Sequence, residues 1–162
     1  MNSSRSSTLR KHTRSPAETA ALAQAIGPTL EPGDCLLLVG PIGSGKTHFA
    51  RHLIQNLMTE IEDVPSPTYT LVQSYETRRG ELWHADLYRL TGTGEIEELG
   101  LTDAFETAIC LIEWPDRLAE LTPEAALHIT FDTDTDPDQT EARNLSFAWT
   151  DPKWQTRLDS LA

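Results

Sequence analysis

One eight-residue segment of the chain has the residue types and the spacing of a phosphate-binding loop. Residues 40–47 match G-x-x-x-x-G-K-[ST] at every fixed position and read Gly40-Pro41-Ile42-Gly43-Ser44-Gly45-Lys46-Thr47. The glycines let backbone N–H groups turn inward around an anion, and a helix that follows directly adds free N–H groups and a positive dipole end. Lys46 can reach the β- and γ-phosphates, and the Thr47 hydroxyl can bind Mg²⁺. We predict that this segment binds a nucleotide.

The flanking residues favour this interpretation over a glycine-rich turn that contains a lysine by chance. An unbroken apolar run over 35–39 predicts a strand buried on both faces. Residues 47–58 predict a helix with apolar side chains on one side, so the motif lies between a strand and a helix. At average composition, the probability that a chain of this length matches the motif by chance is well under about one in 100.

Two acidic residues are candidates to complete a hydrolytic site. Glu113 follows the apolar run 108–112, at the C-terminal edge of a predicted strand, where open α/β sheets bind ligands. An acid there can hold Mg²⁺ directly or through water, as a Walker B residue does. Asp86 ends another predicted strand and could order Mg²⁺ or the attacking water. The alternatives are ordinary surface or turn acids. His84, two residues away, is either a metal ligand or a partly buried strand histidine.

Other residues limit the choice of nucleotide and reaction. The three asparagines, at positions 2, 56 and 144, begin no Asn-Lys-x-Asp guanine-recognition motif, so adenine or a weak base preference is expected. A small-molecule kinase would need arginines that clamp both phosphate donors, and the candidates are Arg78, Arg79 and Arg89. The alternative for the first two is a solvated hairpin tip. A kinase, and a nucleotide-sensing module without turnover, therefore stay open beside an ATPase.

Predicted strands and helices alternate early in the chain, and a meander follows late. Ser15, Pro16 and Glu18 are helix-start signals, and Gly27-Pro28 ends that helix. Further helices are predicted over 47–58, 95–105, 115–121 and 153–161, and strands over 35–39, 71–75, 82–87, 108–112, 127–131 and 145–149. We predict an α/β fold, a P-loop NTPase-like three-layer sandwich with a mixed, partly parallel central sheet and a C-terminal antiparallel meander.

The charge of the chain is unevenly distributed. Its 162 residues carry a net charge of −12, which is a poor basis for gripping nucleic acid alone. Residues 1–15 hold four basic residues and no acid, so the remaining residues, with nine bases and 25 acids, carry −16. Low hydrophobicity predicts that 1–15 is a disordered basic tail, with a short transit peptide as the alternative. Residues 16–162 are then the ATPase domain.

The cysteines and the apolar runs bear on the compartment. Cys35 and Cys110 each lie in an apolar run, so we expect buried, reduced thiols rather than a disulfide scaffold. No apolar run approaches the roughly 20 residues needed to span a bilayer. We expect a soluble, cytoplasmic protein with no membrane partner.

Five further blocks carry a resemblance to a known family. Together with the loop 40–47, they are SPTYTLV at 66–72, HADLYRL at 84–90, EELG at 97–100, IEWP at 112–115 and EAR at 141–143. In order and spacing over about residues 15–149, the chain resembles the bacterial tRNA threonylcarbamoyladenosine biosynthesis ATPase family TsaE, also called YjeE.

The resemblance implies an activity and partners. The family binds and hydrolyses ATP with Mg²⁺, slowly when alone. It works with the TsaB–TsaD pair, which transfers a threonylcarbamoyl group onto adenosine 37 of tRNA, and it is needed for repeated cycles of that transferase. The resemblance thus implies that TsaB and TsaD are the direct partners and that tRNA is reached only through their complex.

The resemblance also implies roles for single residues. Lys46 and Thr47 would hold phosphate and Mg²⁺, Glu113 would be the metal-linked acid, and Asp86 a further acid that binds Mg²⁺ or positions water. Thr68 would lie in a switch-type loop near the γ-phosphate.

The resemblance bears on three other positions, and at two of them the chain departs from the family pattern. Trp114 would lie beside the site, as a marker of the partner interface. His48 stands where many members have Thr or Ser. Thr140 stands where some have an arginine, so Arg143 is the candidate to supply that nucleotide contact.

Overall fold

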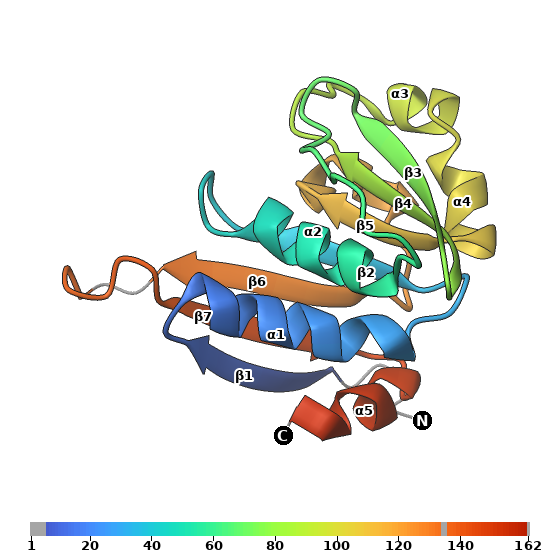
Figure 1. The fold of residues 1–162 in the computed structure, drawn as a ribbon. Coiled ribbons are helices and arrows are strands. Elements are labelled where there is room, and N and C mark those ends of the chain that lie inside the picture. Colours follow the sequence, from blue (N-terminus) through green and yellow to red (C-terminus); the bar gives the residue numbers. More distant parts are fainter. Residues whose placement is uncertain (1–5, 134–135, 162) are drawn as a thin grey trace.

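The apolar run before the glycine-rich loop forms the centre of a seven-stranded sheet. The computed structural model describes residues 6–133 and 136–161. The strands are β1 (Ser7–Thr13), β2 (Cys35–Val39), β3 (Val72–Thr77), β4 (Gly80–Asp86), β5 (Ile109–Glu113), β6 (Leu127–Thr133) and β7 (Arg143–Trp149). Their order in the sheet is β1-β7-β6-β2-β5-β4-β3 (Figure 1). β2 is parallel to β5 and β6, and β4 is parallel to β5, whereas the other pairs are antiparallel.

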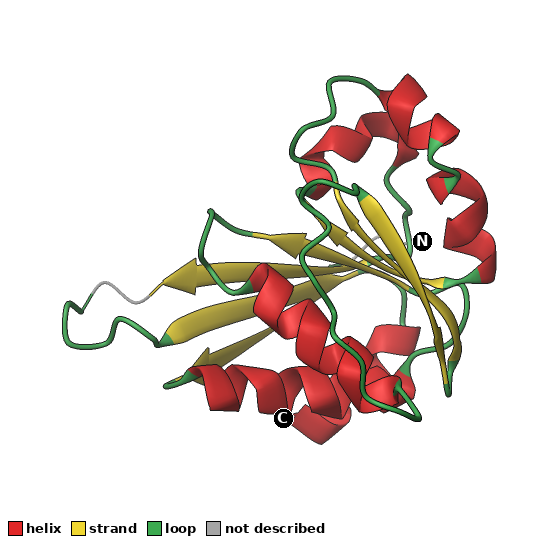
Figure 2. Ribbon diagram, turned by 45° about the horizontal axis from the view of Figure 1, so that its top comes forward, coloured by secondary structure: helices red, strands yellow, loops and turns green. Residues whose placement is uncertain are grey.

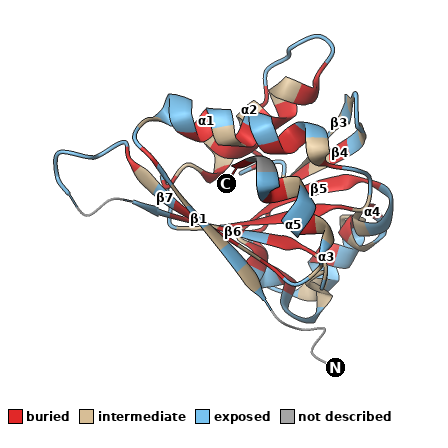
Figure 3. Cartoon of the chain, turned by 90° about the horizontal axis from the view of Figure 1, so that it is seen from below, coloured by how far each residue is buried: buried red, intermediate tan, exposed pale blue. Residues whose placement is uncertain are grey.

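Helices cover the sheet from both sides. The helices are α1 (Pro16–Ile26), α2 (Lys46–Leu57), α3 (Thr93–Glu98), α4 (Leu101–Thr107) and α5 (Lys153–Leu158), with 3-10 segments at Gly27–Thr29, Pro115–Leu121 and Asp159–Leu161. Figures 2 and 3 show α1 and α2 on one side of the sheet and α3 and α4 on the other. In Figure 3 the central strands β2 and β5 are mostly buried, whereas the edge strands β1 and β3 are not.

Two hydrophobic cores hold the three layers together. The larger core joins α1, α2 and α5 to the sheet, with Phe49, Leu53 and Trp154 fully buried in it. The smaller core joins α3, α4 and the segment Pro115–Leu121 to the other face of β2, β4 and β5, through residues such as Leu37 and Ile112. Because β2 and β5 are buried on both faces, they read as continuous apolar runs. The predicted three-layer α/β sandwich with a mixed sheet and a late antiparallel meander is confirmed.

The first helix begins where its sequence signals indicate. The Ser15 hydroxyl accepts a hydrogen bond from the Glu18 N–H, and the Glu18 carboxylate accepts one from the Arg14 N–H. Pro16 occupies the first turn, where its missing N–H costs no hydrogen bond. These contacts satisfy donors that a helix start otherwise leaves free.

The prediction of a disordered tail over 1–15 is wrong for most of the residues that the structure describes there. β1 pairs with β7 along its whole length, from Ser7 opposite Trp149 to Thr13 opposite Arg143. Thr13 is buried, and its hydroxyl lies 2.6 Å from that of Thr19 in α1. Residues 1–5 of the predicted tail lie outside the described residues.

The physical reason is that β1 is an edge strand held mainly by its backbone ladder. Leu9 is its one large apolar side chain, and it packs half-buried against the larger core. The composition of the segment therefore resembles that of an unfolded one, because the ladder partner that stabilises it comes from the other end of the chain.

The two cysteines are buried free thiols, as predicted. Cys35 on β2 lies opposite Cys110 on β5. Burial raises the pKa of the Cys110 thiol to about 12 and raises the pKa of Cys35 well above its usual value. Both side chains therefore stay protonated and act as small apolar residues of the smaller core.

Candidate functional site

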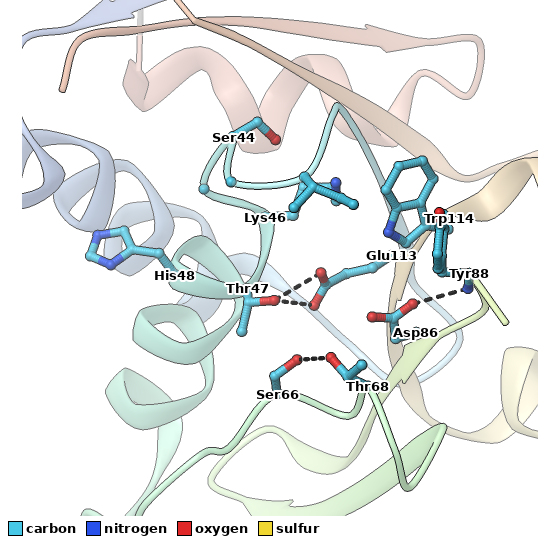
Figure 4. Close-up of a pocket in the computed structure, with 13 residues that line it drawn as sticks. Ser44, Lys46, Thr47, His48, Ser66, Thr68, Asp86, Tyr88, Glu113 and Trp114 are labelled. Carbon is cyan, nitrogen blue, oxygen red and sulfur yellow. Dashed lines mark hydrogen bonds between the residues drawn. The ribbon is translucent and has the colours of Figure 1, made fainter. Parts of the chain in front are cut away.

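A cavity of about 460 Å³ opens at the C-terminal ends of β2, β4 and β5. The glycine-rich loop and the start of α2 form one wall of this cavity, and the ends of β4 and β5 form another (Figure 4). It is lined by Ile42, Gly43, Ser44, Gly45, Lys46, Thr47, His48, Ser66, Thr68, Asp86, Tyr88, Glu113 and Trp114. Most of the predicted site residues are thus brought to one place, at the sheet edge where α/β folds bind ligands.

The loop leads directly into the helix behind it. Gly45 has a left-handed backbone (φ 107°) and precedes the first helical residue, Lys46. Glycine tolerates this conformation without the strain that a Cβ would add. The free N–H groups of the first turn of α2 therefore lie at the cavity, where an anion can accept their hydrogen bonds.

The Lys46 side chain is buried against the loop that carries it. Its ammonium donates to the carbonyl oxygens of Gly40 and of Pro41, the latter at 3.0 Å, and lies 4.2 Å from the centre of the Trp114 ring. Burial lowers the pKa of Lys46, and the nearby carboxylates of Glu113 and Asp86 oppose that shift. A phosphate entering the cavity would offer this ammonium a charged acceptor in place of neutral ones.

Thr47 and Glu113 form the pair expected of a P-loop hydroxyl and a strand-end acid. The Thr47 hydroxyl lies 2.9 Å from each carboxylate oxygen of Glu113 and donates to that carboxylate. Asp86 lies opposite Glu113 in the β4–β5 register, on the same face of the sheet. Burial raises the pKa of Asp86, against the opposing effect of the Tyr88 N–H, which donates to its carboxylate at 3.0 Å.

These oxygens fit Mg²⁺ better than a transition metal. Within residues 6–133 and 136–161, no group of three or more His, Cys, Asp and Glu side chains is placed to hold a metal. Mg²⁺ takes one or two protein carboxylates or hydroxyls and completes its shell with phosphate oxygens and water. Thr47, Glu113 and Asp86 supply such oxygens beside a cavity that can hold phosphates.

The segment before β3 closes the cavity from a third side. Ser66 and Thr68 line it, and their hydroxyl oxygens lie 2.7 Å apart (Figure 4). Leu71, two residues after the exposed Tyr69, has a left-handed backbone (φ 68°), and its carbonyl accepts the Asp86 N–H at 2.9 Å. A movement of this segment would therefore also displace the backbone of Asp86, through the hydrogen bond with Leu71.

Comparison with known proteins identifies the family to which this chain belongs. A family model described as "Threonylcarbamoyl adenosine biosynthesis protein TsaE" matches residues 13–144. The chain belongs to the TsaE family. A Rickettsia felis protein named tRNA threonylcarbamoyladenosine biosynthesis protein TsaE is 32% identical over 88% of both chains, and a Bacillus subtilis protein of that name is 37% identical over 75% of both. The crystal structure of Bacillus subtilis YdiB has a TM-score of 0.75 at 27% identity, over 97% of this chain and 95% of that one.

Three of the predicted nucleotide contacts, Gly40, Pro41 and Arg143, lie outside the first cavity of this TsaE-family chain. Gly40 and Pro41 line a second, apolar cavity of about 660 Å³ on the other side of Trp114. Gly40 has another role: because it lacks a side chain, the loop can pack closely against β6. A Cβ at this position would lie 2.6 Å from the Ser44 hydroxyl and 2.8 Å from the Phe131 carbonyl oxygen.

Arg143 lies behind the loop. It donates to the Ser44 carbonyl at 2.8 Å and to the Gly43 carbonyl at 3.3 Å, and a further hydrogen bond reaches the Thr140 carbonyl. With His48 it lines a smaller pocket of about 250 Å³ next to the loop. Arg143 thus braces the glycine-rich loop, and its contact with a nucleotide stays a prediction.

The arginines considered for a kinase clamp contact other parts of the fold. Arg78 donates to the carbonyls of Asn56 and Leu57, at the end of α2, and Arg79 donates to that of Leu30 at 2.9 Å. Neither lines the cavity, and both hold the β3–β4 hairpin against its neighbours instead of ending in solvent. Arg89 lies outside the cavity lining, with its guanidinium 5.5 Å from the Tyr69 ring centre.

Sequence reasoning missed one cavity residue and left the role of a histidine behind the cavity undecided. The Tyr88 ring lines the cavity and lies 4.7 Å from that of Trp114. Its position two residues after Asp86, just beyond the strand, was the signal that could have indicated it. His84 is fully buried, with Nε2 2.7 Å from a carboxylate oxygen of Glu113. It is therefore a strand histidine that contacts the site from within the core.

Replacing Gly40 with alanine is expected to disturb both the fold and the site. The new Cβ would meet a backbone oxygen that cannot move away alone, and such overpacking typically costs about 1–3 kcal/mol. We expect the melting temperature to fall by about 5 °C and nucleotide affinity to fall with it, as read by thermal unfolding and calorimetry. Gly94→Ala in α3, where a Cβ would meet open space, is the matched control and should neither lower the melting temperature nor change nucleotide affinity. Equal behaviour of the two variants would contradict the assigned role of Gly40.

Proposed function

We propose that this TsaE-family protein binds ATP with Mg²⁺ and hydrolyses it to support repeated cycles of the TsaB–TsaD transferase that makes threonylcarbamoyladenosine at position 37 of tRNA. One observation carries the proposal: Lys46, Thr47, Glu113 and Asp86 surround one cavity at the C-terminal ends of parallel strands. The family supports the place in threonylcarbamoyladenosine biosynthesis.

The chain's own residues suggest how each part of ATP would be handled. The backbone N–H groups of the loop and of the first turn of α2 would donate to the phosphate oxygens, and Lys46 would leave its carbonyl partners for the β- and γ-phosphate oxygens. The Thr47 hydroxyl would leave Glu113 to become a metal ligand, with the Glu113 carboxylate beside it. Bound Mg²⁺ would supply positive charge against the phosphates as the terminal P–O bond breaks.

Asp86 is the candidate to orient the attacking water. Its carboxylate lines the cavity next to Glu113, and burial raises its pKa, which makes it a better hydrogen-bond acceptor than an ordinary aspartate. The water would attack the γ-phosphorus and the bond to the β–γ bridging oxygen would break, leaving ADP and inorganic phosphate. Thr68, on the segment before β3, would lie near the transferred group.

The charge of the protein restricts how it can bind a nucleotide and favours a protein partner over tRNA. ATP is anionic and the chain carries −12, so binding must depend on local positive features: the loop N–H groups, Lys46 and Mg²⁺. The same charge disfavours direct tRNA binding, so tRNA would be reached through TsaB and TsaD. No helix of the described residues is long and apolar enough to cross a membrane.

Reconstitution with purified TsaB, TsaD, tRNA and the threonylcarbamoyl donor tests the proposal. We expect TsaB–TsaD alone to modify about one tRNA per TsaD, and addition of this protein with ATP and Mg²⁺ to allow many. Product yield that does not depend on the protein would contradict the proposal. Labelled phosphate from ATP that appears on a metabolite would indicate a kinase instead, and bound ATP without phosphate release would indicate a sensing module.

A further inference from the structure

A histidine lies directly behind the carboxylate that faces the phosphate site. The side chain of His84 has no solvent exposure, and its Nε2 atom lies 2.7 Å from Oε2 of Glu113. This distance is that of a strong hydrogen bond between a nitrogen donor and a carboxylate. The contact joins a core residue of β4 to the strand-end acid of β5.

The register of the two strands fixes this contact. Asp86 lies opposite Glu113, and His84 lies opposite Leu111, two residues earlier on each strand. Alternate residues of a strand point to the same face, so His84 and Asp86 point to the face that carries Glu113. His84 is therefore the diagonal neighbour of Glu113 on the adjacent strand. Long side chains can bridge the distance between diagonal neighbours.

The other ring nitrogen indicates which tautomer is present. Nδ1 of His84 is buried and has no hydrogen-bond partner among the described residues. A proton on Nδ1 would be a buried donor without an acceptor, and the bare Nε2 would then face the carboxylate oxygen of Glu113. With the proton on Nε2, the ring donates to Glu113 and leaves one acceptor nitrogen unpaired in place of a donor and a close pair of acceptors.

The two oxygens of Glu113 are held differently. Oε1 accepts from the Thr47 hydroxyl at 2.9 Å, whereas Oε2 accepts from both Thr47 and His84. When the Thr47 hydroxyl turns to a cation, His84 is the remaining described donor to this carboxylate. We propose that His84 is a positioning residue: its Nε2–H holds Oε2, so that Oε1 stays turned toward Thr47 and available to Mg²⁺. This inference rests on the proposed function, because it concerns the same site.

Two amide variants separate this role from simple packing. His84→Gln places an amide N–H near the position of Nε2, whereas His84→Asn places one near Nδ1, too short to reach Glu113. The measured quantity is the gain in ADP affinity when Mg²⁺ replaces EDTA, by calorimetry on the full chain. We expect His84→Asn to reduce this gain about 10- to 100-fold, the range typical of lost contacts to metal ligands, and His84→Gln to retain most of it.

The control is another strand histidine replaced in the same way. His128 on β6 is exposed and lies outside the nucleotide cavity, so His128→Asn should leave the Mg²⁺ gain unchanged. ADP affinity in EDTA should be similar in all four proteins, since His84 does not line the cavity. A folded His84→Asn variant with the wild-type Mg²⁺ gain would overturn the proposal. Wild-type protein that binds no nucleotide would instead overturn the proposed function.

A measurement on the wild-type chain keeps the inference testable if the variants do not fold. Long-range ¹H–¹⁵N NMR correlations report which nitrogen of the His84 ring carries the proton. We expect a proton on Nε2, with its resonance shifted by ADP plus Mg²⁺ and not by ADP in EDTA. A proton on Nδ1 with a bare Nε2 would overturn the proposal.

Discussion

Lys46→Ala is expected to reduce ATP affinity by about 100-fold or more, the effect of removing a charged partner from a buried polar site. The ammonium is the one lysine or arginine head group that lines the nucleotide cavity in the described part of the chain. The chain is acidic overall, so no general attraction for ATP replaces it. Calorimetric titration with ATP and Mg²⁺ measures the loss directly.

Lys11→Ala is the matched control for this change. Lys11 lies on β1, away from the nucleotide cavity, and its replacement removes the same charge and the same atoms as that of Lys46. Its ATP affinity should equal that of the wild type. If Lys46→Ala bound ATP as tightly as the Lys11→Ala control, the assignment of the loop as the phosphate site would be wrong.

Glu113→Gln is expected to abolish turnover while preserving much of the nucleotide binding. The amide keeps the size of the side chain and can still accept from Thr47, but it removes the negative charge that would hold Mg²⁺. We expect ATP hydrolysis, measured as phosphate release with TsaB and TsaD present, to fall by about 100-fold or more. ADP affinity in EDTA should change little.

Two further variants show whether the loss of hydrolysis is specific to the site and what Asp86 does there. Glu120→Gln, at an exposed acid in the segment Pro115–Leu121, makes the same chemical change outside the site and should leave hydrolysis intact. Asp86→Asn should also abolish hydrolysis. If Asp86 orients water, Mg²⁺ will still raise the ADP affinity of this variant, whereas that gain will vanish if Asp86 is a metal ligand. Normal hydrolysis by both site variants would refute the assigned roles.

The features that sequence predicted correctly are encoded locally. The loop 40–47 needs only its own glycines, lysine and threonine, together with the strand before it and the helix after it. Glu113 follows a run buried on both faces, so its place at the strand end could be inferred from five consecutive residues. These local signals were enough for the fold class and for the place of the cavity at the C-terminal ends of β2, β4 and β5.

The features that sequence missed depend on pairing between distant segments. β1 looks disordered by composition, because its stability comes from a ladder with β7 near the other end of the chain. His84 could not be assigned from its neighbours, since its contact with Glu113 follows from the register of β4 against β5. The contacts of Arg143 with the Gly43 and Ser44 carbonyls follow from the approach of β7 to the loop, and its contact with a nucleotide stays a prediction.

The most direct test compares wild-type protein with Glu113→Gln in the reconstituted tRNA modification reaction. The measured quantity is the number of threonylcarbamoyladenosines formed per TsaD. Our account predicts many for the wild type and about one for the variant, because the site's hydrolysis would be needed to begin each new cycle. Equal product from the two proteins would contradict it.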